Sequence, residues 1–297
     1  MNYQVDKLLN RKGKYNTKGF PFLYEILNKI NMNLDLNKIL EQVCNSATDI
    51  GDYLKTEQSK LKATAVEMKG LRDYVSYVDK EAEKQLVSAL KNVIPNAGFL
   101  TEEDTVEQEE KDYTWIIDPL DGTSNYVHGL APYNVSIALV YKKETILGVV
   151  YDPLANEMFT AIKGEKALLN NEPIDVSTKD ELKNSFIGFG IPYEMDTNTA
   201  AILKNTWKHF GQASFRLNGA AALELCFVAC GRYDAFFHSG LSPWDVAAGA
   251  FILQQAGGKI TDYNNGHNYI FGKEVVATNL LIHTDIMKNI INLNKVD

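Results

Sequence analysis

Two carboxylates follow one apolar run in the stretch WIIDPLDGTSNYVHG, residues 115–129. An ordinary Asp-Pro turn needs only one acidic residue, so the pair Asp118 and Asp121 points to a bound cation. Further acids stand where the hydrophobic pattern predicts that a strand ends or a helix begins, namely Asp79, Glu102 and Asp245. Hard cations such as Mg2+ take oxygen ligands, and the lack of His and Cys among these acids counts against zinc. These acids are therefore candidate ligands for a hard divalent cation.

The segment DPLDGT also carries groups that could bind a phosphate. Pro119 restricts the backbone directly after the first acid, so both acids could face the same ions, with the carbonyl oxygen of Leu120 as a further ligand. Gly122 allows the backbone to approach a ligand closely. The amides of Gly122, Thr123 and Ser124 are expected to open a helical turn, which is a favourable place for an anion. An Asp-Pro turn capped by a second Asp remains an alternative for these residues alone.

The composition is that of a globular protein with a net negative charge. The chain has 297 residues, of which 45% are hydrophobic and 23% charged, and no apolar run approaches the roughly 20 residues of a membrane span. The N-terminal segment lacks the apolar core of a secretion signal, so the expected location is cytoplasmic. A net charge of -8 argues against general nucleic-acid binding. It does not argue against a phosphate substrate, because bound divalent cations invert the local field.

The hydrophobic pattern predicts one domain preceded by an extension. Residues 1–33 are polar and weakly patterned, and we expect them to be an N-terminal extension. The domain is expected over residues 34–297, with two closely packed lobes over about 34–178 and 179–297. The three cysteines lack the spacing of metal ligands and are expected to be reduced thiols in the core.

Local patterns predict a mixture of helices and strands. Helical spacing predicts an amphipathic helix over residues 34–58 and a second helix from Asp79 to Pro95. Alternation over residues 134–177 predicts an antiparallel meander with hairpin turns at KKET and LNNEP. Beyond about residue 180 strands and helices alternate, and GAAALELCFVACG is expected to be a buried helix.

Four motifs in order along the chain resemble those of the inositol monophosphatase family, within the larger group that includes fructose-1,6-bisphosphatase. They are DYVSYVD, LTEED, DPLDGTSNYVH and WDVAAGAFILQQAGG, and the likeness covers roughly residues 34–285. The resemblance implies an α+β fold of the layered αβαβα type, often assembled as a homodimer. It also implies a Mg2+-dependent phosphomonoesterase that is inhibited by Li+.

The same resemblance implies which residues hold the two to three Mg2+ ions of such a site. The first ion would be bound by Glu102, Asp118 and the carbonyl oxygen of Leu120. The second would be bound by Asp118, Asp121 and Asp245.

Catalytic and substrate-binding residues follow from the resemblance in the same way. The catalytic residues would be Asp79, Glu102 and Thr123, with Asp79 and Glu102 reaching a third, weakly bound ion through water. Thr123 with Asp79 would orient and deprotonate the metal-activated water that attacks phosphorus in line. The substrate would contact a set of residues from several segments, namely Leu120, Asp121, Gly122, Thr123, Gly219, Ala220, Ala221, His238 and Asp245.

The segment GFGIPYEM lacks the Ser pair that members of the family often have beside the substrate, and two single positions also depart from the family pattern. At the position of His238, typical members carry a Glu that hydrogen-bonds the hydroxyls of inositol, and a His cannot replace the two oxygens of a carboxylate. Thr101 stands where the family usually has Gly. The metal chemistry therefore follows from the resemblance, whereas the alcohol that is released does not.

The expected activity is hydrolysis of a small polyol or sugar phosphate, with myo-inositol 1-phosphate as the first candidate. Fructose-1,6-bisphosphate, histidinol phosphate and 3'-phosphoadenosine 5'-phosphate are alternatives for the same fold. A catalytically silent regulatory or binding protein is an alternative of another class, although the chain retains each expected metal ligand and Thr123. The expected partners are a small phosphate ester and a second copy of the chain, without nucleic acid or membrane.

Overall fold

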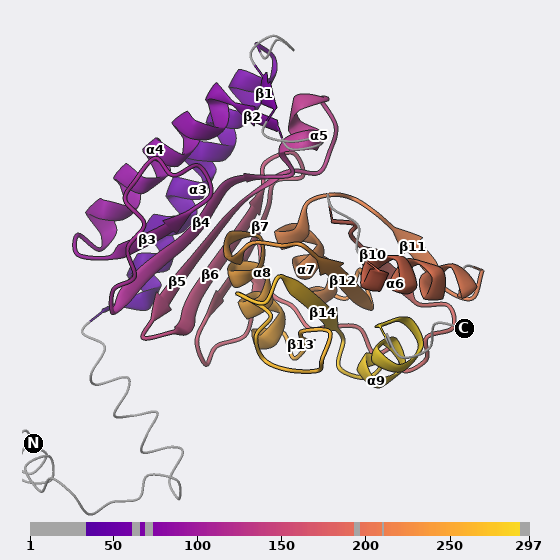
Figure 1. Ribbon diagram of the computed structural model, residues 1–297. Helices are drawn as coiled ribbons and strands as arrows, with labels where there is room; N and C mark the ends of the chain where they lie inside the picture. Colours follow the sequence, from indigo (N-terminus) through magenta and orange to yellow (C-terminus); the bar gives the residue numbers. More distant parts are fainter. Residues whose placement is uncertain (1–33, 61–65, 69–73, 193–196, 210, 292–297) are drawn as a thin grey trace, which may run out of the picture. The chain divides into compact units, whose positions relative to one another are not determined.

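Two large sheets with helices between them and on their outer faces make up most of the described part of the chain (Figure 1). The computed structural model describes residues 34–60, 66–68, 74–192, 197–209 and 211–291. The expected N-terminal extension lies outside these residues. The helices and sheets belong to one compact unit that begins at Leu36. No helix in the described ranges is both long and apolar enough to cross a bilayer.

The larger sheet has seven strands in sequence order. They are β3 (Gly98–Thr101), β4 (Tyr113–Asp121), β5 (Asn134–Tyr141), β6 (Glu144–Asp152), β7 (Glu157–Ile162), β8 (Leu168–Leu169) and β9 (Glu172–Pro173). Only β3 and β4 pair in parallel, and the rest form the antiparallel meander that the sequence predicts. Both predicted hairpin turns are confirmed, because Lys142, Lys143, Asn170 and Asn171 all have the positive φ of tight two-residue turns.

Two long helices cover one face of this sheet. They are α3 (Leu36–Gln58) and α4 (Tyr77–Val93), which contact each other and strands β4 to β7. In α3 the buried side chains fall on one stripe, at Ile39, Val43, Ala47, Ile50 and Leu54. The spacing of three and four residues is that of an amphipathic helix, as predicted. A short β1 (Val66–Met68) pairs with β2 (Tyr74–Ser76) just before α4.

The central layer consists of α7 (Ala221–Ala229) and α8 (Pro243–Gln255), which pack on each other and on strands of both sheets. Both helices are mostly apolar and lack a polar stripe, as expected for helices buried between two layers. Small residues bring them together: a Cβ added to Gly249 would lie 2.7 Å from the carbonyl oxygen of Ala222. This close contact sets the middle of α8 against the start of α7.

The second sheet has five strands in the order β11-β10-β12-β14-β13. They are β10 (Phe186–Phe189), β11 (Ser214–Arg216), β12 (Ala235–Ser239), β13 (Lys259–Thr261) and β14 (Glu274–Thr278). Its outer face packs against α6 (Thr197–Lys208), α9 (His283–Ile286) and a π-helical turn, η3 (Met287–Ile291). The layers therefore follow the expected αβαβα order (Figure 1). Strands β11 and β14 and helix α9 were not predicted, and the division into two lobes stays a prediction.

The Asp-Pro turn that was an alternative for DPLDGT is not present, because β4 continues through Pro119 to Asp121. Its pairing with β5 shifts there, from Asp118 opposite Ser136 to Asp121 opposite Asn134. Two residues of β4 thus oppose one of β5, which is a β-bulge, and a bulge is one of the few places where a sheet accepts Pro.

Candidate functional site

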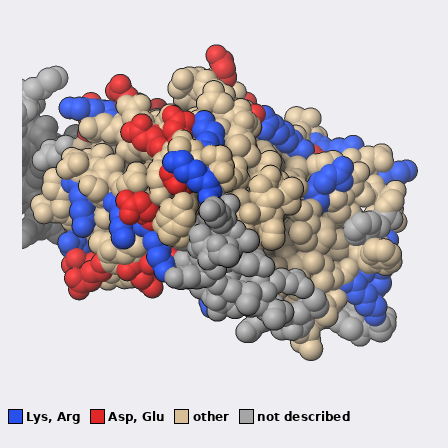
Figure 2. All heavy atoms as spheres, turned by 90° about the horizontal axis from the view of Figure 1, so that it is seen from above, with Lys and Arg blue, Asp and Glu red and all other residues tan. Residues whose placement is uncertain are grey.

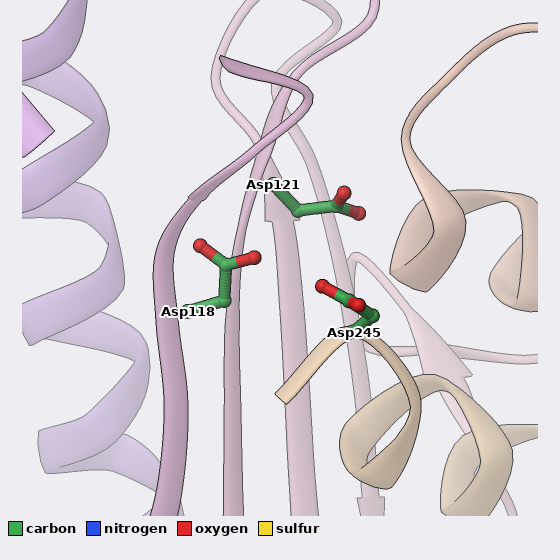
Figure 3. Close-up of side chains that lie close together, drawn as sticks. All are labelled: Asp118, Asp121 and Asp245. Atoms are coloured by element: carbon green, nitrogen blue, oxygen red, sulfur yellow. The ribbon is translucent and has the colours of Figure 1, made fainter. Parts of the chain in front are cut away.

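Three carboxylates from two elements meet at one end of β4. Asp118 and Asp121 lie on β4, and Asp245 lies in the first turn of α8. One oxygen of each can be chosen so that all three lie within 4.8 Å of one another. In Figure 3 the carboxylates of the three residues face a common space. The structure thus brings together acids that are more than 100 residues apart in the chain.

The bulge explains why both acids of β4 reach this space. In a regular strand, residues three apart point to opposite faces of the sheet. The extra residue between Asp118 and Asp121 restores the same face for both. Pro119 and Leu120 are the two residues that form the bulge, so the Pro-Leu spacer has a direct geometric role.

Asp118 is buried, with 1% of its surface exposed, and accepts a 2.8 Å hydrogen bond from the amide of Leu120. Burial raises the pKa of its carboxyl well above the usual range, and neighbouring charges raise it further. The neighbours that act on it, in order of effect, are Glu102, Asp121, Asp245 and Asp79. All five predicted acids therefore lie close enough to interact, although only three form the tight cluster among the described residues.

Asp121 also anchors the start of α7. Its carboxylate accepts hydrogen bonds from the amides of Ala221, at 3.2 Å, and Ala222, at 2.8 Å. The side-chain amide of Asn134 donates to the same carboxylate at 2.8 Å. Burial raises the pKa of Asp121 to about 6, and these hydrogen bonds limit the rise. Asn134, the first residue of β5, was not predicted as a site residue, and its only signal is a polar side chain opening an apolar strand.

Asp245 has a local structural role as well. Ser242 is the N-cap of α8, Pro243 follows it, and Asp245 stands at the third helical position. The Asp245 carboxylate accepts a 2.7 Å hydrogen bond from the amide of Ser242, which completes a capping box. The cap orients the carboxylate at the N-terminal end of the helix, where the helix dipole favours negative charge.

A hydroxyl and a carboxylate lie beside the cluster. The Thr123 hydroxyl lies 3.3 Å from Oδ2 of Asp79 and 3.0 Å from the carbonyl oxygen of Leu120. Asp79 comes from the first turn of α4 and is 1% exposed, and Thr123 opens the short helix α5 (Thr123–Val127). The hydroxyl has one hydrogen for these two acceptors, so its lone pairs remain able to accept from a third group. This geometry is compatible with the prediction that Thr123 and Asp79 act together on the attacking water.

The predicted substrate loop lies against the same end of β4. Gly219 has a φ of +77°, Ala220 is the N-cap of α7 and Ala221 opens that helix. Gly122 has a φ of +91°, and an added Cβ would lie 3.0 Å from the carbonyl oxygen of Pro132 and 3.3 Å from Cβ of Ala220. The Gly is thus required by backbone packing in addition to any approach to a ligand.

Asn125 is a second residue that sequence reasoning did not single out. Its side-chain amide donates to the carbonyl oxygen of Asn218 at 2.7 Å and to that of Pro132 at 2.8 Å. It thereby ties α5 to the loop before α7. Asn125 stands within the motif DPLDGTSNYVH, but the motif alone does not reveal which backbone groups it holds.

His238 lies on β12, and its described contacts run along the second sheet. Its ring nitrogen Nδ1 is 2.6 Å from the carbonyl oxygen of Ser239. The ring covers Gly190, whose added Cβ would fall 1.6 Å from Cδ2 of His238. Burial lowers the pKa of His238 to about 4, so the imidazole is neutral at pH 7. A substrate contact by His238 stays a prediction.

Comparison with known proteins assigns this arrangement to a family. The sequence profile of the inositol monophosphatase family matches residues 35–294. The chain belongs to the inositol monophosphatase family. The expected family and layered fold are thereby confirmed.

Some relatives within the inositol monophosphatase family are named SuhB, and others are named as phosphatases. A protein of Pasteurella multocida called Nus factor SuhB is 36% identical over 86% of this chain and 96% of its own length. The structure of the extragenic suppressor protein suhB from Bartonella henselae matches with a TM-score of 0.81 and 33% identity, over 88% of this chain and all of that one. An IMPase/NADP phosphatase complexed with Mg2+ and phosphate matches with a TM-score of 0.76 and 26% identity, over 88% and 97% of the two chains.

The donor set fits a hard divalent cation. The three clustered side chains offer carboxylate oxygens. Burial makes the ionised forms of Asp118 and Asp121 unfavourable, and repulsion from neighbouring acids adds to this effect at Asp118. A Mg2+ ion would relieve this repulsion. The chain thus has the phosphatase-like fold and the acidic cluster of its family, while the number of ions and the residue roles stay predictions.

Proposed function

We propose that this chain is a Mg2+-dependent phosphomonoesterase that acts on a small polyol or sugar phosphate. The observation that carries the proposal is the convergence of Asp118, Asp121 and Asp245, with Asp79 and Thr123 beside them. The ions would be held by carboxylates and one backbone oxygen, namely Glu102, Asp118, Asp121, Asp245 and the Leu120 carbonyl. Bound Mg2+ would neutralise phosphate charge, lower the pKa of the attacking water and stabilise the leaving oxygen.

The residues of the chain would orient and deprotonate that water. A water molecule would donate to the Thr123 hydroxyl, whose own hydrogen would be directed at Asp79, 3.3 Å away. As the water oxygen bonds to phosphorus, its proton passes to Thr123, and the Thr123 proton passes to Asp79. The bond from phosphorus to the ester oxygen breaks on the opposite side. The leaving oxygen takes a proton from a solvent water, and Asp79 returns its proton to solvent before the next turnover. Around the phosphate, the amides at the start of α5 supply donors.

The test is phosphate release from a panel of esters by the full chain. The panel contains myo-inositol 1-phosphate, fructose-1,6-bisphosphate, histidinol phosphate and 3'-phosphoadenosine 5'-phosphate, with NADP added because one structural relative is named for it. Each ester is assayed with Mg2+, with EDTA, and with Mg2+ plus Li+. We expect Mg2+-dependent release that Li+ inhibits, with myo-inositol 1-phosphate as the first candidate for the best ester. Release that is equal in EDTA would refute the proposed chemistry.

Position 238 gives a separate prediction on specificity. His238→Glu should raise the turnover of myo-inositol 1-phosphate relative to the other esters, because a carboxylate offers two acceptors to sugar hydroxyls where a neutral imidazole offers one. The measurement is the ratio of kcat/KM values across the panel, with His238→Gln as a control that has the size of Glu without its charge. An unchanged ratio would mean that position 238 does not set specificity.

A second candidate function is a regulatory or binding role, and the name Nus factor carried by a relative with 36% identity favours it. Although the net charge of the chain is -8, its charged side chains are unevenly distributed over the surface. In Figure 2 acidic and basic side chains are mixed over the part with α3 and α4, whereas Lys and Arg predominate over the part with β11 and α6. Absence of phosphate release from every ester, by protein that binds Mg2+, would favour this second function.

The phosphatase proposal includes two further expectations, namely that the chain forms a homodimer and that it does not bind nucleic acid. Sedimentation of the full chain tests the dimer. Gel-shift titration with RNA and DNA, at two salt concentrations, tests the other expectation, because nonspecific binding by a basic face weakens steeply with salt.

A further inference from the structure

Glu83 is a buried carboxylate that lies outside the acidic cluster. It follows Asp79 by four residues in α4, so both side chains lie on the same face of this helix. None of the Glu83 surface is exposed. Its carboxylate accepts four hydrogen bonds, and all four donors belong to the end of β3 and the loop that follows it.

The donors stand on both sides of Glu102. Oε1 of Glu83 accepts from the Thr101 hydroxyl at 3.0 Å, the Thr105 amide at 2.8 Å and the Thr105 hydroxyl at 2.7 Å. Oε2 accepts from the Glu103 amide at 2.7 Å. The residues immediately before and after Glu102 are thereby tied to α4, Thr101 through its side chain and Glu103 through its backbone amide.

We propose that Glu83 is a positioning residue that holds Glu102 toward the acidic cluster and so sets the affinity for the divalent cation. The inference rests on the proposed function. One rigid helix then carries Asp79 and also fixes the loop that carries Glu102, so the distance between these two acids is set by α4. Partners in the layer behind metal ligands orient those ligands, and their loss commonly lowers metal affinity about 10–100-fold.

Glu83→Gln changes this arrangement at a defined point. A glutamine has one oxygen that accepts and one NH2 group that donates. With its oxygen at the Oε1 position, its NH2 group meets the Glu103 amide; in the opposite orientation it meets the three donors from Thr101 and Thr105. Either way two donors oppose each other, and the loop beside Glu102 must shift.

The experiment measures the melting temperature of the full chain against Mg2+ concentration at constant pH, which reports binding to the folded protein. The matched control is Asp234→Asn. Asp234 is also buried and accepts from the Ser177 hydroxyl and the Phe186 amide, but it supports the five-stranded sheet. We expect both variants to melt earlier in EDTA. Only Glu83→Gln should raise the half-saturating Mg2+ concentration, by about tenfold or more, with kcat recovering at high Mg2+.

An unchanged half-saturating Mg2+ concentration in Glu83→Gln, or an equal rise in Asp234→Asn, would overturn the positioning role. If Glu83→Gln does not fold, Thr105→Val decides instead, because it removes one hydroxyl donor, and Thr105→Ser should restore wild-type Mg2+ affinity. A wild-type chain that shows no response to Mg2+ would refute the proposed function itself, and this outcome is distinguishable from the others.

Discussion

Replacing Asp118 by Asn should abolish phosphate release and, without Mg2+ at pH 7.5, raise the melting temperature. Activity should fall more than about 100-fold, because the cluster loses a ligand and not merely a supporting hydrogen bond. Stability should rise because the substitution removes a carboxyl whose ionisation is disfavoured by burial and by four other acids. The hydrogen bond that Asp118 accepts from the Leu120 amide can pass to the side-chain oxygen of Asn. A gain of about 1 kcal/mol would raise the melting temperature by about 2–4 °C.

The gain in stability of Asp118→Asn over wild type depends on pH, and the raised pKa of Asp118 fixes the direction of this dependence. The pKa of Asp118 in the folded protein lies above its unfolded value, so the protonated carboxyl favours folding. Its stabilising contribution is complete below the unfolded pKa and is lost as the pH rises through the folded pKa. The same direction holds for Asp121, whose contribution is lost as the pH rises from about 4 to about 6. In EDTA, the advantage of Asp118→Asn over wild type should therefore be small at low pH and grow toward pH 8.

Asp121→Asn is the informative control, because it removes the same charge from the same cluster. The Asp121 carboxylate accepts from Asn134, Ala221 and Ala222, so the NH2 group of an Asn must meet at least one donor in either orientation. This variant should lose activity without the gain in stability. If Asp118→Asn keeps its activity, Asp118 does not bind a catalytic ion. If it melts no later than wild type in EDTA at pH 7.5, repulsion from the other acids does not destabilise the folded chain.

The sequence predicts the parts of the site that depend on neighbouring residues. The position of Asp245 at a helix start and the helical turn at Thr123 follow from short local patterns. The meander over β5 to β9 follows from alternation and turn residues in the same way. The acids themselves stand out in the sequence because each lies at the end of a predicted element.

Contacts between distant segments were not predictable from one sequence. Asp121 and the Ala222 amide are 101 residues apart, and Glu83 and Thr105 are 22 apart, and no local pattern links either pair. The bulge in β4 resembles a turn in the sequence because Pro and Asp are typical of turns, and only pairing with β5 shows that the strand continues. Strands such as β11, three residues long, are too short for alternation to identify.

Thr123→Val should lower kcat about 10²–10⁴-fold while leaving the Mg2+ dependence of the melting temperature close to wild type. The Thr123 hydroxyl lies 3.3 Å from Asp79 Oδ2 and 3.0 Å from the Leu120 carbonyl oxygen, which places it to relay a proton from water to Asp79. Thr123→Ser keeps this hydroxyl and should keep most of the activity. Asp79→Asn should match the loss of Thr123→Val, because an amide oxygen accepts the hydrogen bond but does not take the proton. A parallel loss of Mg2+ binding in Thr123→Val would contradict the relay, since it would mean that the hydroxyl mainly holds the Leu120 carbonyl oxygen in place as a ligand.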